Sequence, residues 1–329
     1  MFTFHPFLYI FEIVHFIFRK KADTVLNTEK IFTHRAGIVA VAVVVCFLWG
    51  SAFPFIKLSY ELLDIQQGEV YKQVLFAGYR FFLASLMLAA FLVIKERRIA
   101  FTKGSLPALL QVGFFQTTLQ YVLFYIGLSY STGIQGSIIT GSSTFFSIIL
   151  AHYMYNNDRI NKRRLIGLLL GFTGVMLASS TKGALRFSFG LGELVLLLSA
   201  FSNSLGGILA KNRASAMDTV YLTSYQMMLG SFVLLLLGAS GAGWKPFHFT
   251  GLSLLYLIYL AFLSAAGFAL WNTLLKYNKV GKVSMYFFLV PVFGVLLSAM
   301  LLHETLHSIV FAALLFVVIG IIVVNQEKS

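Results

Sequence analysis

Four ionisable side chains interrupt the apolar stretches of this chain, and they are the first candidates for chemistry. Arg80 follows Lys72 by eight residues within an apolar segment, so at ~1.5 Å per residue it lies roughly 12 Å from the end of a helix. A charge at membrane depth is costly and usually faces a cavity or a polar partner. We expect Arg80 to attract a carboxylate or phosphate of a substrate. The structural alternative is that it snorkels or pairs with Glu193.

Two lysines end apolar segments in a related context. Trp49 precedes Lys57 by eight residues, and Asn203 precedes Lys211 by the same interval. If the two segments run in opposite directions, the two lysines lie at opposite ends of the protein, which suggests a pair of gates. The alternative is that both are ordinary lysines at helix ends without a role in gating. Glu193 begins the segment that Lys211 ends, where it either complements the helix dipole or takes up a proton for coupling.

Uncharged polar and aromatic residues within the apolar stretches mark a candidate binding surface. Gln116, Gln120 and Tyr121 fall on one face of a helix, at positions i, i+4 and i+5. Amides and aromatic rings together suit a solute that offers apolar surface and hydrogen-bonding groups. The residues that we expect to bind the substrate are Arg80, Trp49, Gln120, Tyr121, Trp271 and Asn272, with Lys57, Lys211 and Glu193 as weaker candidates for gating or coupling.

One motif matches a catalytic signature letter for letter. His303, Glu304 and His307 form the H-E-x-x-H pattern of zinc proteases. That chemistry needs both histidines on one face of a helix and a glutamate that activates a metal-bound water. Here the motif falls in a short turn between two apolar segments, without a convincing third ligand. We therefore expect neither a metal nor a cofactor, and an intramembrane zinc enzyme is kept only as an alternative function.

The elements that position these residues are ten apolar segments of about the length that a helix needs to cross a bilayer. Tyr130 and Tyr277 lie 147 residues apart, as do Ser137 and Ser284, so the segments form two matching sets of five. An odd number of crossings makes the second set enter the membrane from the opposite face. The expected spans are Ala36–Lys57, Lys72–Ile94, Leu106–Tyr130, Ile134–Tyr155, Leu165–Ser180, Leu191–Ala210, Thr219–Ala239, Leu252–Leu275, Val280–Leu302 and His307–Val324.

This pattern predicts an all-α polytopic membrane protein with ten transmembrane helices, arranged as two inverted five-helix repeats. The first repeat covers residues 36–181 and the second covers residues 189–325. Residues 1–35 are expected to form a cytoplasmic or interfacial N-terminal arm, with an eleventh span or an early start codon as alternatives. Gly167-x-x-x-Gly171 favours close helix packing, with a homodimer contact as the second option.

The composition supports the same class of protein. The chain is 58% hydrophobic and 11% charged, and most of its 25 Lys and Arg gather on one set of ends and loops. This is the positive-inside pattern, which places both termini in the cytoplasm. The formal net charge of +13 therefore reflects topology and contact with membrane lipids, and a nucleic-acid partner is not expected.

Several short motifs resemble those of one transporter family, the EamA-like family of the drug/metabolite transporter superfamily. The motifs are Leu48-Trp49-Gly50-Ser51-Ala52-Phe53, Tyr79-Arg80-Phe81-Phe82, Gly192-Glu193-Leu194, Pro291-Val292-Phe293 and Glu304-Thr305-Leu306. The resemblance covers residues 38–325 and implies a ten-helix carrier of small metabolites, often an exporter, with a cavity between the repeats. The first repeat departs from the pattern, because Thr144 stands near the position that corresponds to Pro291.

We therefore expect a secondary transporter that exports small organic metabolites by alternating access, driven by a gradient or by exchange. Its expected partners are a small-molecule substrate and membrane lipids, and its expected location is a bacterial cell (inner) membrane. A non-transporting scaffold is the third class of function, and it predicts no change in solute flux when Arg80 is replaced.

Overall fold

The computed structural model describes residues 29–95, 101–130, 139–178, 190–302 and 309–326, and all regular structure within these ranges is helical. Seven spans among them are long and apolar enough to cross a membrane. They are Arg35–Leu62, Val70–Ile94, Leu106–Tyr130, Leu191–Arg213, Thr219–Ala242, Gly251–Tyr277 and Val280–Leu301.

The helices follow the expected order along the chain. In the first set, α3 (Arg35–Leu62) and α4 (Val70–Ile94) precede a span made of α5 (Leu106–Gly113), η1 (Phe114–Leu119) and α6 (Gln120–Tyr130), and then come α8 (Ser143–Met154) and α9 (Lys162–Ala178). The second set contains α10 (Leu191–Arg213), α11 (Thr219–Ala242), α12 (Gly251–Tyr277), α13 (Val280–Ser284), η2 (Met285–Phe288), α14 (Leu289–Leu301) and α15 (Ile309–Asn325). Because α8, α9 and α15 are short within the described residues, the count of ten crossings stays a prediction.

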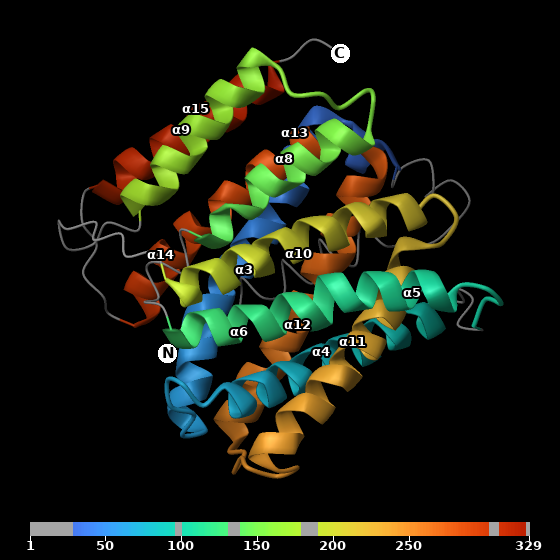
Figure 1. Cartoon of the computed structure of the whole chain (residues 1–329), viewed down its shortest axis with the longest axis vertical. Helices are drawn as coiled ribbons and strands as arrows, with labels where there is room; N and C mark the ends of the chain where they lie inside the picture. Colours follow the sequence, from blue (N-terminus) through green and yellow to red (C-terminus); the bar gives the residue numbers. More distant parts are fainter. Residues whose placement is uncertain (1–28, 96–100, 131–138, 179–189, 303–308, 327–329) are drawn as a thin grey trace.

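The helices pack in reciprocal pairs (Figure 1). Helix α4 lies along α11, and α9 lies along α15. Helix α3 contacts α12 and α14, while α10 contacts α6 and α8. Since α10, α11 and α15 are the counterparts of α3, α4 and α9 in sequence order, each helix meets partners that correspond across the two sets. The contacts of the first set are therefore reciprocated by the second set.

The third span departs from a regular α-helix at η1, which is a π-helical turn. Two hydroxyls of the neighbouring α10 donate to carbonyl oxygens beside this turn, Ser202 Oγ to Phe115 O and Ser199 Oγ to Gln120 O, both at 2.7 Å. Lipid cannot supply donors to irregular backbone, so hydroxyls from a packed helix must do so. Such turns occur frequently at functional sites.

The second set has its own irregular segment, where α13 passes through the 3₁₀ turn η2 into α14. Thr144 Oγ1 donates to Ser284 O and Cys46 Sγ donates to Tyr286 O, each at 3.2 Å. Pro291, which lacks a backbone N–H, follows the turn by three residues. Irregular backbone at this depth is tolerated where it is buried in protein or lines a cavity.

Small residues allow the closest helix contacts. A Cβ atom added to Gly206 would lie 2.7 Å from Gln116 N, so α10 can approach η1 only because this position is glycine. The Gly167-x-x-x-Gly171 motif is used in the same way within the chain. A Cβ at Gly167 would lie 2.8 Å from Gly320 O of α15, and one at Gly171 would overlap the Phe288 ring. The packing interpretation of this motif is therefore confirmed, and a homodimer stays a prediction that the motif does not support.

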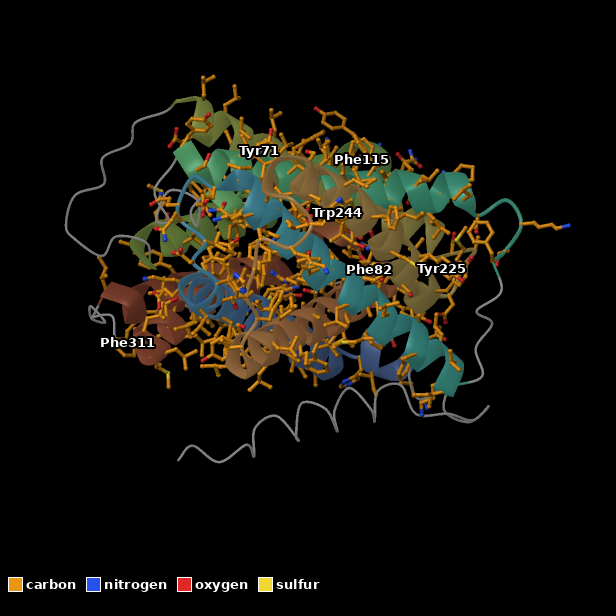
Figure 2. All side chains as sticks on the ribbon, turned by 90° about the horizontal axis from the view of Figure 1, so that it is seen from below. Tyr71, Phe82, Phe115, Tyr225, Trp244 and Phe311 are labelled. Carbon is orange, nitrogen blue, oxygen red and sulfur yellow. The ribbon has the colours of Figure 1, made fainter. Side chains whose placement is uncertain are left out.

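The outer faces of the bundle are apolar and aromatic, as expected for surfaces in contact with lipid. Tyr71, Trp244 and Phe311 are 58%, 62% and 68% exposed, and Figure 2 shows Phe311 at the margin of the molecule. Tyr71 is the second residue of α4 and Trp244 is the second residue after α11, so both lie near helix ends. Aromatic residues at such positions are typical of membrane–water interfaces.

Candidate functional site

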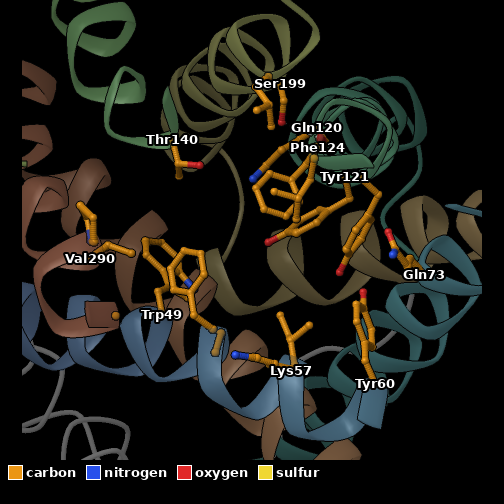
Figure 3. Close-up of a pocket in the computed structure, with 18 of the residues that line it drawn as sticks. Trp49, Lys57, Tyr60, Gln73, Gln120, Tyr121, Phe124, Thr140, Ser199 and Val290 are labelled. Carbon is orange, nitrogen blue, oxygen red and sulfur yellow. Dashed lines mark hydrogen bonds between the residues drawn. The ribbon is translucent and has the colours of Figure 1, made fainter. Parts of the chain in front are cut away.

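A cavity of about 910 Å³ lies between the two sets of helices. It is lined by residues of α3, α4, α6, α8, α10, α12, η2 and α14, and Figure 3 shows Trp49 and Lys57 facing it from one side while Gln120 and Tyr121 face it from the other. At one end it reaches Glu61, near the end of α3, and Gln66 and Gln67 in the exposed turn that follows. The cavity therefore opens at the end of the molecule where α3 ends and α4 begins.

The mouth of the cavity is held by contacts in the α3–α4 turn. Glu69 forms an ion pair with Lys72 at 2.7 Å and accepts a hydrogen bond from Gln66 N at 2.8 Å. The Lys72 ammonium and the Gln66 amide favour the ionised carboxyl, and they lower the pKa of Glu69 below its ordinary value. Both contacts lie beside the opening of the cavity.

Arg80 is the one buried cation of the lining among the described residues, at 3% exposure. It lies ten residues into α4, roughly 15 Å from the beginning of the helix. Its Nε donates to Ser264 Oγ at 2.7 Å and to Leu260 O at 3.2 Å, so α12 holds the guanidinium in place. The alternative of a pair with Glu193 is wrong, because Arg80 makes its hydrogen bonds to α12.

An aromatic wall faces the cavity on the α3 side. The Trp49 ring packs against Phe268 at 5.3 Å and Phe287 at 5.6 Å between ring centroids, and all three residues line the cavity. On the opposite side, Tyr121 packs against Phe81 at 4.3 Å. Offset and edge-on aromatic pairs of this kind stabilise each other and give a fixed apolar surface.

Gln120 and Tyr121 line the cavity as the sequence predicted, together with Trp49, Arg80 and Lys57. The Gln120 Oε1 atom is buried and accepts no hydrogen bond from the described residues. An unpaired buried acceptor beside a cavity is destabilising until a donor reaches it. Gln120 is therefore suited to accept a hydrogen bond from a bound solute or water.

Trp271 and Asn272 do not line this cavity, so their role in substrate binding stays a prediction. Trp271 packs against Trp49, at 5.5 Å between ring centroids, and both rings line a smaller void of about 20 Å³. Asn272 is fully buried, where it accepts from Gln116 Nε2 at 3.1 Å and donates to Thr223 Oγ1 at 3.2 Å. Polar side chains in an apolar bundle need partners, and these amides join helices to one another.

A buried ion pair lies outside the cavity lining, beside the turn between α8 and α9. Arg164 Nη1 lies 2.7 Å from Asp158 Oδ1, and both side chains are 2% exposed. Asp158 Oδ2 accepts from Gly281 N at 3.0 Å, and Arg164 Nη1 also donates to Arg159 O at 2.9 Å. Asp158 and Arg164 border the turn between α8 and α9, whereas Gly281 belongs to α13. This cluster, Asp158–Arg164–Gly281, therefore joins the two sets of helices.

Lys211 makes its hydrogen bonds to the end of α12. Its ammonium donates to Leu275 O and, at 2.7 Å, to Asn278 O. Lys57 lines the open cavity instead, so the two lysines lie at opposite ends of the molecule. Glu193 Oε2 accepts from Gly190 N at 2.8 Å and caps the beginning of α10, and it does not line the cavity.

Sequence reasoning missed Tyr60 and Phe124, which line the cavity together with Tyr125, and it missed the contact between Asp158 and α13. Tyr60 and Phe124 follow the predicted positions by about one helical turn, which could have indicated them. The contact with α13 had no such signal, because Gly281 lies 123 residues after Asp158. The H-E-x-x-H motif lies outside the described residues. Within them, no group of three His, Cys, Asp or Glu could hold a metal ion.

Apolar helices that surround a deep, partly polar cavity open at one end define an integral membrane transporter. The chain belongs to the EamA-like transporter family, whose family model matches it twice, over residues 36–180 and 190–326. The molecule is therefore a membrane transporter of metabolites.

Individual relatives agree with this assignment. The chain is 28% identical to "Uncharacterized transporter YvbV" of Bacillus subtilis (strain 168), over 86% of this chain and 89% of that protein. It is 25% identical to a "Probable amino-acid metabolite efflux pump" of Escherichia coli (strain K12), over 88% of this chain and 94% of that one. A solved crystal structure shares the fold with a TM-score of 0.72 at 14% identity, over 88% of this chain and 96% of that chain.

Proposed function

We propose that this protein exports a small anionic organic metabolite by alternating access, with Arg80 as the main anchor of the substrate and Trp49, Gln120, Tyr121 and Lys57 around it. The observation that carries the proposal is a buried arginine in the wall of a cavity that opens beside the α3–α4 turn. The proposed architecture is ten helices in two inverted repeats, for which the reciprocal helix contacts are the support.

The charge distribution supports an orientation in the membrane. Arg159, Arg163 and Arg164 lie around the turn between α8 and α9, and Lys211 lies near the end of α10. Basic residues concentrate on the cytoplasmic side of membrane proteins. In this orientation both termini are cytoplasmic, the cavity opens to the outside, and the membrane is the bacterial cell membrane. The two ends of the cavity would then close alternately, and the Asp158–Arg164–Gly281 cluster would close the cytoplasmic end.

Export is tested by an untargeted comparison of extracellular metabolites. Cells that overproduce the protein should accumulate at least one anionic solute in the medium relative to cells with an empty vector, because the carrier would lower the barrier to its exit. Liquid chromatography with mass spectrometry measures the difference. Equal media from the two strains, with the protein present in the membrane, would count against export.

Orientation and closure are tested with single cysteines. Cys46 is the only cysteine and is buried, so a Cys46→Ser chain provides the background. Ser129→Cys, in the cavity lining, should react with a membrane-impermeant maleimide added outside intact cells. Ser284→Cys, which is 3% exposed and lies near Gly281 in α13, should react at least ten times more slowly. Mass spectrometry measures the labelled fraction of each variant.

Labelling of intact cells and of inside-out vesicles together distinguishes the two possible orientations. In inside-out vesicles the Ser129→Cys thiol should be protected, since the reagent would have to pass the cytoplasmic closure. Faster labelling of Ser129→Cys from the cytoplasmic side would show that the orientation is reversed. Equal labelling of both cysteines from outside would contradict the closure.

A zinc-dependent intramembrane enzyme has no support from the comparisons, since the relatives named above are transporters. Replacement of both His303 and His307 by alanine should leave export unchanged under this proposal.

A further inference from the structure

Arg80 restricts the kind of chemical group that can bind next to it in the cavity. This inference rests on the proposed function of the cavity. Both hydrogen bonds that Arg80 makes to the described residues use Nε. The Nη1 and Nη2 atoms take part in neither of these hydrogen bonds, and Arg80 lines the cavity. Two parallel N–H groups of a guanidinium match the two oxygens of one carboxylate.

Negative charge is scarce where the cavity is deep. Among the described residues of the lining, Glu61 is the one acid, and it is exposed near the end of α3, four residues beyond Lys57. The other charged residues of that lining, Lys57 and Arg80, are both cations. An ammonium group attached beside the carboxylate of a substrate would therefore lie next to the Arg80 guanidinium without a carboxylate to offset the repulsion.

The walls favour an apolar body for the same substrate. Trp49, Phe268, Phe287 and Phe124 line the cavity, and the first three form a continuous set of ring contacts with centroid distances of 5.3 to 5.6 Å. Rings in this arrangement offer apolar surface and edges to a planar or branched group. Lys57, at the open end, adds a second positive charge on the route of an anion to Arg80.

From these observations we propose a substrate class: carboxylates with an aromatic or branched apolar body and no ammonium group on the neighbouring carbon. Free α-amino acids should bind more weakly, because the neutral Gln120 Oε1 offsets only part of the repulsion between their ammonium group and Arg80. Neutral alcohols should also bind more weakly, because they leave the guanidinium without an anion. Acids of this kind arise from amino acids by reactions that remove or acylate the amino group.

Three probes with one skeleton test the class. The purified full chain in detergent is titrated with 3-phenylpropionate, L-phenylalanine and 3-phenylpropan-1-ol by isothermal titration calorimetry. The expected Kd of 3-phenylpropionate is at least tenfold lower than that of each of the other two. Arg80→Gln should remove the preference for the acid over the alcohol, while the control Lys245→Gln, which changes an exposed lysine outside the lining, should keep it.

The outcomes separate this inference from the function on which it rests. If L-phenylalanine binds as tightly as 3-phenylpropionate and both are lost in Arg80→Gln, the cavity is an anion site but the substrate class is wrong. If the acid and the alcohol bind alike in the unaltered chain, Arg80 is not an anchor and the proposed function falls as well. Absence of binding by 3-phenylpropionate would also overturn the substrate class.

Discussion

Cells that produce Arg80→Gln should export about 10- to 100-fold less of the solute that the unaltered protein releases. Hydrogen bonds to a charged group contribute about 1.5–3 kcal/mol each, and each 1.4 kcal/mol corresponds to roughly a factor of ten. Glutamine keeps part of the side-chain volume and removes the charge. The measurement is the initial rate at which the solute appears in the medium, divided by the amount of protein in the membrane.

The folded state should survive this change, because α12 does not depend on the guanidinium for its own hydrogen bonds. Ser264 Oγ donates to Leu260 O at 2.7 Å, so both partners of Arg80 remain paired in the variant. Ser264→Ala is the matched control, since it removes one contact of Nε and leaves the charge in the cavity. Arg80→Lys should keep part of the rate. Export by Arg80→Gln at the unaltered rate would show that Arg80 has only a structural role.

The helical spans could be predicted because their cause is local. Each apolar stretch must satisfy its own backbone hydrogen bonds in lipid, so length and composition indicate a helix. The prediction failed to find the π-helical turn at Phe114–Leu119 and the 3₁₀ turn at Met285–Phe288. Those irregularities depend on hydroxyl donors from helices that are distant in sequence, such as Ser202, and a periodic pattern does not contain this information.

The candidate site, like the fold, could be predicted only in part. Arg80, Trp49, Gln120 and Tyr121 were found from charge and residue type, and the structure places them around one cavity. Asn272 was predicted by the same reasoning, yet its amide joins α12 to Gln116. A polar residue in an apolar helix faces either a cavity or another polar residue. Sequence periodicity gives the face of the helix but not what lies opposite to it.

The Asp158–Arg164 pair should show the largest effect on stability, and the effect should be unequal for the two partners. Removal of one partner of a buried ion pair costs about 3–5 kcal/mol, because the other charge is left without compensation. Asp158→Ala leaves a buried guanidinium, which cannot lose its charge, and an unpaired Gly281 N–H. Arg164→Ala leaves a carboxyl group, which can take up a proton. We therefore expect the greater loss of unfolding free energy, about 5 kcal/mol, from Asp158→Ala.

The double variant Asp158→Asn/Arg164→Met separates folding from gating. An amide can still accept the hydrogen bond of Gly281 N, and methionine fills the space of the arginine without a charge, so most of the stability should return. The attraction that closes this end is lost, however, and the Ser284→Cys thiol should then be labelled from the cytoplasmic side at least ten times faster than in the unaltered background. Thermal unfolding in detergent and maleimide labelling of inside-out vesicles measure the two effects. A double variant that is stable and still protects Ser284→Cys would show that the ion pair supports the fold and does not control access, and closure would then have to reside in Lys211 and the end of α12.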